Sequence, residues 1–438
     1  MDRRMVPTYL AALCLLLALS LGVQAALSVT GGIDGIGEAG SAASAEEGAS
    51  NATKEAPTPG NTLISSQSYR NKGKLIEVTP AGEVVWEYAP EDSRVFDAEV
   101  LDNGNLLVSV ATRLPAAECP DRALDVAADH CVYNRVQELD YGSKDVVWKY
   151  SWYDAYITHH EVHDADRLPN GNTAIVDMGN DRALVVDRAG EIVWEWKADR
   201  YLAPGSEFYE QYGGDPNPGD EADWTHINDI DRLVNGNFQL SIRNFDSVIE
   251  VDPESKEVVG VIGRPGNHTR LYEQHNPDRL ESAGTVLIAD SENDRVIEYD
   301  LRTGEPVWTY GGTGLLTWPR DVDRLPNGNT LITDSQRNRV IEVDAEGEVV
   351  WEYGGAPFAY SADRVGVPED ATGLPSGRTL DSRVAEGPLV GAVSKLASYA
   401  RFVVPAWIGV PVLLNVLSLV ASGGWLLAEL YRARSIQF

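Results

Sequence analysis

Hydrophobic and polar residues alternate along most of the chain in short runs separated by turn residues. The stretch TLITDSQRNRVIEVDAEGEVVWEY, from Thr330 to Tyr353, contains three such runs in succession. Alternation with a period of two predicts half-buried β-strands, and the Asn, Asp and Gly residues between the runs are typical of tight turns. The pattern therefore predicts an all-β protein built from short strands.

This pattern repeats along the chain. Each copy contains a first strand that ends in Asp-Arg-Leu or a variant of it, an Asn-Gly or related turn, and three further strands. Copies start near Pro59, Phe96, His163, His226, Gln274 and Trp318, and the first of them lacks its opening strand. Six copies of four strands predict a six-bladed β-propeller over residues 59–355, whereas a solenoid would lack the four-strand meander and a sandwich would not repeat.

The ring needs a strand to complete its first blade. Residues after Gly355 are the candidates to supply it, although the segment YSADRVGVPEDATGLPSG resembles the other first strands only weakly. By composition, residues 356–395 otherwise suggest a linker. Residues 30–58 are rich in Gly, Ala, Ser and Glu, which predicts a disordered acidic linker because such a segment cannot bury a core.

Two long apolar runs flank the propeller. Residues 1–29 predict a transmembrane helix or a signal peptide, and both alternatives stay open because Val23-Gln24-Ala25 is compatible with cleavage. Residues 402–430 predict a second transmembrane helix, with a buried core helix as the alternative. Arg3, Arg4, Arg432 and Arg434 at the outer ends of the two runs favour cytoplasmic termini. We therefore expect a cell-membrane protein, in contact with lipid, whose propeller lies on the extracellular side.

Charge narrows the possible partners. The chain of 438 residues carries 36 Lys and Arg against 67 Asp and Glu, a net charge of −31. This balance excludes a nucleic-acid binder, which needs basic groups to displace phosphate counterions. An acidic surface poor in lysine is typical of a halophilic protein, because concentrated salt screens self-repulsion. An acidic surface that faces a ligand is the alternative.

Cysteines and sequons fit an extracellular domain. Cys119 and Cys131 lie close together in an insertion, and we expect them to form a disulfide that closes a surface loop. Asn51 and Asn267 begin Asn-x-Thr sequons and are predicted glycosylation acceptors.

One position of the repeat varies while its surroundings are maintained. Three residues before the Asp of Asp-Arg-Leu, or its counterpart, the copies carry Phe96, His163, Asn228, His275 and Arg320. These positions should converge at the mouth of the central channel, where propellers bind ligands. Five of the seven histidines fall at the starts of blades: 159, 160, 163, 226 and 275. His226 is expected on the same strand face as Asn228.

Arg243 points to the charge of the ligand. Allowing for a one-residue gap, it replaces an Asp that other copies carry as Asp177, Asp290 and Asp334. A cation in the place of an anion suggests an anionic ligand, with a surface ion pair as the alternative. Guanidinium groups among the histidines argue against a metal site, so we predict no metal. The motifs of nucleotide binding, zinc proteases and α/β-hydrolases are absent, and we predict no cofactor.

These residues resemble the nucleotide-independent arylsulfate sulfotransferase family. The resembling segments are THHEVHDADRLPNGN (158–172), WTHINDIDRLVNGN (224–237), LSIRN (240–244) and QHNPDRL (274–280). The resemblance implies ping-pong sulfuryl transfer from a phenolic sulfate ester to an acceptor phenol through a sulfohistidine. By this resemblance His275 is the nucleophile, and His226, Asn228 and Arg243 bind the sulfate. Either His160 or His163 also binds the sulfate. The register of the repeat favours His163, whereas the order of residues in the family motif favours His160. Arg320 is a further candidate.

An aryl substrate needs an aromatic mouth. The insertion at 201–225 runs into His226 and is expected to supply it, through Tyr201, Phe208, Tyr209, Tyr212 and Trp224. The principal alternative is a non-catalytic extracellular propeller that binds a protein or glycan, but such a module does not need imidazoles from several blades. A quinoprotein-like dehydrogenase is a further alternative, for which neither an acidic metal site nor a cofactor-stacking tryptophan is identified.

Overall fold

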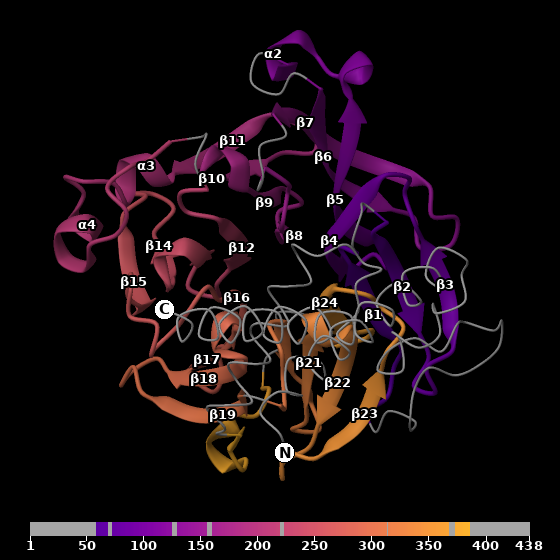
Figure 1. Ribbon diagram of the computed structural model, residues 1–438, viewed down its shortest axis with the longest axis vertical. Coiled ribbons are helices and arrows are strands. Elements are labelled where there is room, and N and C mark those ends of the chain that lie inside the picture. The colour runs from indigo at the N-terminus through magenta and orange to yellow at the C-terminus, as the bar shows by residue number, and fades with distance from the viewer. Residues whose placement is uncertain are drawn as a thin grey trace, which may run out of the picture. The chain divides into compact units, whose positions relative to one another are not determined.

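The propeller predicted from the repeat is confirmed. The computed structural model describes residues 58–68, 72–124, 129–155, 160–219, 223–312, 314–367 and 373–385. They form six sheets around one axis (Figure 1). Both predicted membrane spans, Asn51 and nearly all of the 30–58 linker lie outside these residues. Within the described part of the chain, no helix has the length and apolar character needed to cross a bilayer.

Each blade is a four-stranded meander whose first strand lies nearest the axis. The first three blades comprise β24 (Ala359–Arg364), β1 (Thr62–Ser66), β2 (Lys74–Val78) and β3 (Val84–Tyr88); β4 (Ser93–Val100), β5 (Leu106–Pro115), β6 (His130–Leu139) and β7 (Val146–Ala155); and β8 (Ala165–Arg167), β9 (Thr173–Asp177), β10 (Arg182–Val186) and β11 (Ile192–Lys197). The other three comprise β12 (Ile227–Arg232), β13 (Phe238–Ile242), β14 (Ser247–Val251) and β15 (Val258–Gly263); β16 (His275–Leu280), β17 (Thr285–Asp290), β18 (Arg295–Asp300) and β19 (Pro306–Gly312); and β20 (Pro319–Arg324), β21 (Thr330–Asp334), β22 (Arg339–Val343) and β23 (Val349–Tyr353).

The ring is closed by a strand from the end of the domain. β24 pairs antiparallel with β1, with Arg364 opposite Thr62, and so completes the first blade. The propeller therefore extends beyond Gly355, and residues 356–395 are not simply the linker that their composition suggested. Further along, β25 (Arg383–Ala385) adds to β19 in parallel. Backbone pairing thus joins the end of the domain to its first blade and also to its fifth.

The core consists of apolar layers between neighbouring blades. Ile64 and Ile76 of the first blade, for example, contact the cluster that contains Leu331 and Trp351 of the last. The repeated Arg of Asp-Arg-Leu also joins blades, since Arg324 pairs with Glu298 at 2.9 Å and Arg364 with Glu342 at 2.8 Å, all four side chains being fully buried. These maintained residues of the repeat hold the ring together, which leaves the variable positions available for chemistry.

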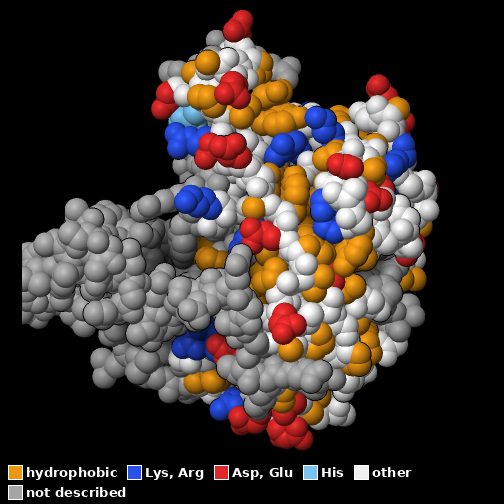
Figure 2. Space-filling view, turned by 90° about the vertical axis from the view of Figure 1, so that its right-hand side faces the viewer, with side chains coloured by type: hydrophobic (Ala, Val, Ile, Leu, Met, Phe, Trp, Pro, Cys, Tyr) orange, Lys and Arg blue, Asp and Glu red, His pale blue; other side chains and the backbone are white. Residues whose placement is uncertain are grey.

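Three features lie away from the axis: the segment with the two cysteines, the loop that contains Asn267, and the outer face of the propeller. β5, β6 and β7 have ten residues each and are the longest of the described strands. A disulfide joins Cys119, in the segment between β5 and β6, to Cys131 in β6. Asn267 is half-buried in the loop before β16, where its Oδ1 accepts a hydrogen bond from Thr269 Oγ1 at 2.7 Å. On the edge seen in Figure 2, hydrophobic side chains are interspersed with charged ones of both signs. The clusters of histidine and buried carboxyl side chains lie instead at the axis.

Candidate active site

The variable position of the six first strands forms a ring of side chains at the axis. The five positions predicted from the sequence come together, and the sixth, supplied by the closing strand β24, is Tyr360. Its ring centroid lies 5.3 Å from Phe96, 5.5 Å from His163 and 6.3 Å from His275. The Arg320 guanidinium lies 5.2 Å from the same ring, and the Tyr360 hydroxyl donates to the carbonyl oxygen of Asn228 at 3.3 Å. Tyr360 therefore contacts all five of the predicted positions.

A recurring β-bulge turns these side chains toward the axis. The register between first and second strands shifts at Asn228 in β12, immediately after His275 in β16, and at Arg320 in β20. A bulge sets two residues against one on the partner strand and re-aims a side chain that regular pleating would direct elsewhere. Local strand irregularity, and not alternation alone, builds the ring.

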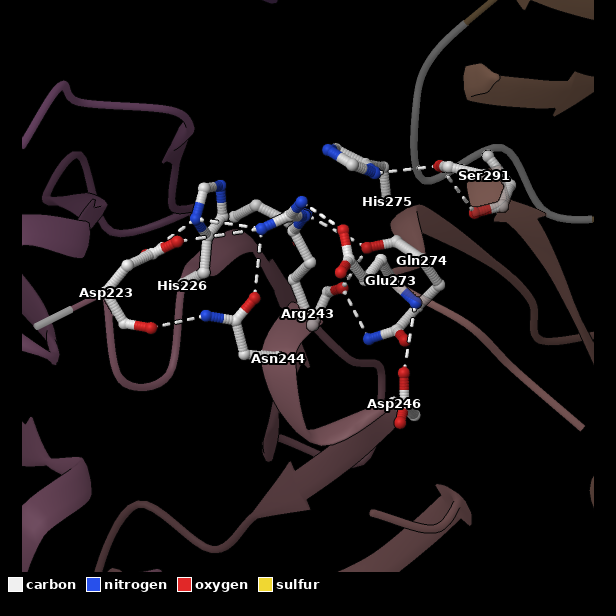
Figure 3. Close-up of polar contacts among 12 residues, drawn as sticks. Asp223, His226, Arg243, Asn244, Asp246, Glu273, Gln274, His275 and Ser291 are labelled. Atoms are coloured by element: carbon white, nitrogen blue, oxygen red, sulfur yellow. Dashed lines mark hydrogen bonds and ion pairs between the residues drawn. The ribbon is translucent and has the colours of Figure 1, made fainter. Parts of the chain in front are cut away.

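His275 is the most enclosed of the three channel imidazoles. It is 1% exposed, and its Nδ1 lies 2.8 Å from Ser291 Oγ (Figure 3). Burial lowers the pKa of His275 well below its usual range, and the positive groups of Arg320, Arg243, His226 and His163 lower it further. The ring is therefore neutral at neutral pH, the form in which imidazole is a nucleophile.

His226 and Arg243 lie beside His275 and share the carboxylate of Asp223. The Nδ1 of His226 is 2.7 Å from Asp223 Oδ1 and 3.2 Å from Arg243 Nη1. Arg243 also donates to Glu273 and, at 2.9 Å, to Asn244 Oδ1 (Figure 3). Its Nε is buried and has no hydrogen-bond partner among the described residues. A buried donor of this kind calls for an acceptor, which a bound anion would provide.

The backbone brings His226 to the site in a way that strand periodicity does not predict. His226 precedes β12 and has a left-handed φ of 49°. Glu273, Trp318 and Phe358 occupy the same place in three other blades and have φ values of 49°, 55° and 54°. Non-glycine residues rarely adopt this conformation, and they do so chiefly at turns and functional sites. Their recurrence forms a second set of side chains near the axis.

His163, and not His160, belongs to the ring. The His163 ring lies 5.3 Å from His226 and 4.4 Å from Phe96. His160 instead faces Asp154, with its Nδ1 3.1 Å from Oδ1. Its neighbour His159 lies outside the described residues. The repeat register therefore predicts which of the two histidines lies in the ring, and which of them binds the substrate stays a prediction.

Arg320 is held by aromatic rings at the axis. Its guanidinium lies 4.5 Å from the ring centroids of both Trp318 and Phe358, and its Nη1 donates to Gln67 Oε1 at 2.6 Å. Cation–π contacts of this kind hold a guanidinium without neutralising it. A positive charge is thus maintained beside His275 and Tyr360.

Two expectations about this region are wrong. Tyr201, Phe208 and Trp224 do not line a mouth: α3 (Ala198–Tyr201), α4 (Glu207–Tyr212) and the segment after them bury these rings in the core layer between the third and fourth blades. The alignment of Arg243 with Asp177 is also wrong. Arg243 begins the turn between second and third strands, a place that Met178, Ser291 and Ser335 take in other blades, and Ile242 replaces the Asp.

Carboxyl groups line the channel along the same first strands, or, in the case of Asp164, directly before the strand. They are Asp97, Glu99, Asp164, Asp166, Asp229, Asp231, Asp278, Asp321, Asp323 and Asp363. Burial, reinforced by the neighbouring carboxylates, raises the pKa of Asp97 to about 8 and that of Asp278 to about 7. Many of these ten carboxyl groups are therefore protonated at neutral pH. They repel an anionic ligand less than ten ionised carboxylates would.

These raised pKa values predict that the protein loses stability as the pH rises. The folded state binds more protons than the unfolded chain between about pH 4 and 8, so the free energy of unfolding falls across this range. We expect Tm, measured by calorimetry at constant salt, to fall by at least about 5 °C between pH 5 and 8, at about 2–4 °C per kcal/mol. Asp97→Asn should flatten this slope and Asp252→Asn, in an exposed turn, should not. A Tm that rises over the range would contradict the assignment.

Several histidines at one site also raise the question of a metal ion. Among the residues that the structure describes, no group of three His, Cys, Asp or Glu side chains is arranged to hold one. The side chains around His275 include two arginines, which suit an anion.

Comparisons with known proteins identify the family. The family model of arylsulfotransferase (ASST) matches residues 50–276, and that of outer membrane protein assembly factor BamB matches residues 235–376. No curated protein matches significantly.

Among solved structures, a protein of unknown function from Bacteroides caccae is 16% identical, with a TM-score of 0.47 and coverage of 70% of this chain and 98% of that one. Virginiamycin B lyase from Staphylococcus aureus is 12% identical, with a TM-score of 0.41 and coverage of 68% and 85%. The arylsulfotransferase model spans more than half of the chain and includes His163, His226, Asn228, Arg243 and His275. This protein therefore belongs to the arylsulfotransferase family.

Proposed function

We propose that this protein transfers a sulfuryl group from a phenolic sulfate ester to an acceptor phenol, through a sulfohistidine formed at His275. The observation that carries the proposal is the surroundings of His275: a buried imidazole that lies beside His226 and Arg243 and in the same ring of side chains as His163 and Arg320. The positive charge of these neighbours, together with burial, lowers the pKa of His275. Sulfuryl transfer spreads negative charge over the non-reacting oxygens, as phosphoryl transfer does. Fixed positive donors around the nucleophile are therefore what the reaction needs.

Each neighbour of His275 has a role in this proposal. Arg243 supplies its unpartnered Nε to a sulfate oxygen, and Arg320 supplies positive charge from the blade that follows that of His275. His226 protonates the departing phenolate, since Asp223 at its Nδ1 stabilises the positive charge of the ring before transfer. His163 and Asn228 complete the binding set. Phe96, Trp318 and Tyr360 offer aromatic surface for the aryl group.

The two half-reactions balance through the same groups. In the first, the lone pair of His275 forms an N–S bond while the ester S–O bond breaks, and the phenolate leaves with that electron pair and takes a proton. In the second, an acceptor phenol loses its proton to His226, and its oxygen forms an O–S bond while the N–S bond breaks. The electron pair of the N–S bond returns to His275, which becomes a neutral imidazole again. No other substrate or cofactor enters this sequence.

The direct test uses the purified full-length protein in concentrated salt with 4-nitrophenyl sulfate and phenol. The proposal predicts nitrophenolate release that depends on the acceptor, together with phenyl sulfate detected by mass spectrometry. Absence of both products across a range of phenols would overturn it and would favour a non-catalytic binding propeller.

A further inference from the structure

Ser291 lies against the ring nitrogen of His275 that faces away from the other histidines. It is buried at the start of the turn Ser291–Asn293, between β17 and β18. Its Oγ is 2.8 Å from His275 Nδ1, 2.6 Å from the carbonyl oxygen of Pro319 and 3.4 Å from that of Ala289 (Figure 3). One hydroxyl thus lies between an imidazole nitrogen and two carbonyl groups.

The count of protons fixes the direction of these hydrogen bonds. A serine hydroxyl has one proton to donate, and a carbonyl oxygen can only accept. The short contact to Pro319 therefore takes the hydroxyl proton, and the lone pairs of Oγ are left to face His275. Nδ1 must then carry a proton and donate it to Oγ, because two lone pairs cannot form a hydrogen bond.

A second blade supports this direction. Ser335 begins the corresponding turn of the last blade, and its Oγ donates to the carbonyl oxygen of Ala359. Ala359 precedes Tyr360 in the ring as Pro319 precedes Arg320, so the bond is the same element of the repeat. No histidine occupies the channel position of that blade, which is Arg320. The serine-to-carbonyl bond therefore does not depend on an imidazole.

We propose that Ser291 is a positioning residue that holds His275 in the tautomer protonated at Nδ1, so that Nε2 carries the lone pair that attacks sulfur. This inference rests on the proposed function. Figure 3 shows Nε2 pointing away from Ser291, toward the side where His226 and Arg243 lie. His226 and His163 are likewise held through Nδ1, by Asp223 Oδ1 at 2.7 Å and by the carbonyl oxygen of Glu161 at 3.1 Å.

The neutral hydroxyl matters for the chemistry. A carboxylate at Nδ1 would stabilise the protonated, non-nucleophilic ring, whereas a hydroxyl orients the ring without stabilising a charge before the reaction. When Nε2 bonds to sulfur and the phenolate leaves, the ring becomes cationic and its Nδ1 proton remains on the hydrogen bond to Ser291. The hydrogen bond to Ser291 thus leaves the His275 ring neutral before the reaction and still orients it in the sulfohistidine intermediate.

The test reads the tautomer and the rate separately in full-length variants. In ¹⁵N-histidine spectra, with the His275 signals assigned by comparison with His275→Ala, we expect a protonated Nδ1 and an unprotonated Nε2 in the parent protein. Ser291→Ala should mix the tautomers and lower the rate of the nitrophenolate burst by about 10–100-fold, with KM nearly unchanged because Ser291 does not touch substrate. Ser291→Thr, which keeps the hydroxyl, should restore the parent tautomer.

Ser335→Ala is the matched control, because it removes the same bond of the repeat where no histidine lies. Equal losses of burst rate in Ser291→Ala and Ser335→Ala, or an Nε2-protonated His275 in the parent protein, would overturn the inference even if the protein is active. If the parent protein releases no phenol, the proposed function fails, and the spectra still report whether Ser291 sets the tautomer.

Discussion

His275→Ala abolishes both the burst of phenol that the parent protein releases from donor alone and the steady transfer to an acceptor. In a ping-pong reaction without acceptor, the sulfuryl group accumulates on the nucleophile, and each active site releases one phenol. Among the histidines that the structure describes, His275 is the most deeply buried, at 1% exposure. Removing this nucleophile should lower the rate by more than about 10³-fold, and by up to about 10⁶-fold. Stopped-flow absorbance of nitrophenolate measures it.

The control for this variant is His130→Ala, which removes an imidazole from β6 in another blade and should leave the burst intact. Intact-mass and peptide analysis of the parent protein, quenched with donor alone, should place the added sulfuryl group on His275. A burst that survives in His275→Ala would mean that the nucleophile is misassigned, and His226, the histidine beside Arg243, is the next candidate.

Arg243→Ala should lower the burst rate by about 10²–10³-fold while leaving the nucleophile in place, as when one donor of an oxyanion hole is removed. Two effects add. The buried Nε no longer reaches a sulfate oxygen, and the carboxylates of Glu273 and Asp223 lose the cation that they share. Arg243→Lys should recover only part of the rate, because an ammonium group cannot reproduce the planar fork of donors.

A companion variant separates anion binding from the ion pair. Glu273→Gln removes the main carboxylate partner of Arg243 but keeps its guanidinium, so its burst rate should stay near that of the parent protein or rise. If Glu273→Gln loses as much rate as Arg243→Ala, the ion pair itself, and not a bond from Arg243 to the sulfuryl group, supports the reaction.

Local patterns in the sequence determine the architecture of this protein. Alternation fixes each strand, the Asn-Gly turns fix the meander, and six copies fix the number of blades. The maintained Arg and Glu of the repeat are explained by the buried pairs between blades, such as Arg324 with Glu298. The varied position before Asp-Arg-Leu also predicted five members of the ring at the axis. This prediction was possible because the position depends only on the register within one repeat.

Tertiary structure alone decided the rest of the site. The sequence did not predict Tyr360 as a ring residue, because its strand is far from β1 in the sequence and joins the first blade only when the ring closes. Ser291 and Arg243 begin equivalent turns, a correspondence hidden by the apparent gap in alignment. The aromatic insertion could serve the mouth or the core, and only the packing of Phe208 and Trp224 between two blades shows which. Residues distant in sequence meet through ring closure, bulges and left-handed turns, which depend on contacts that no single repeat contains.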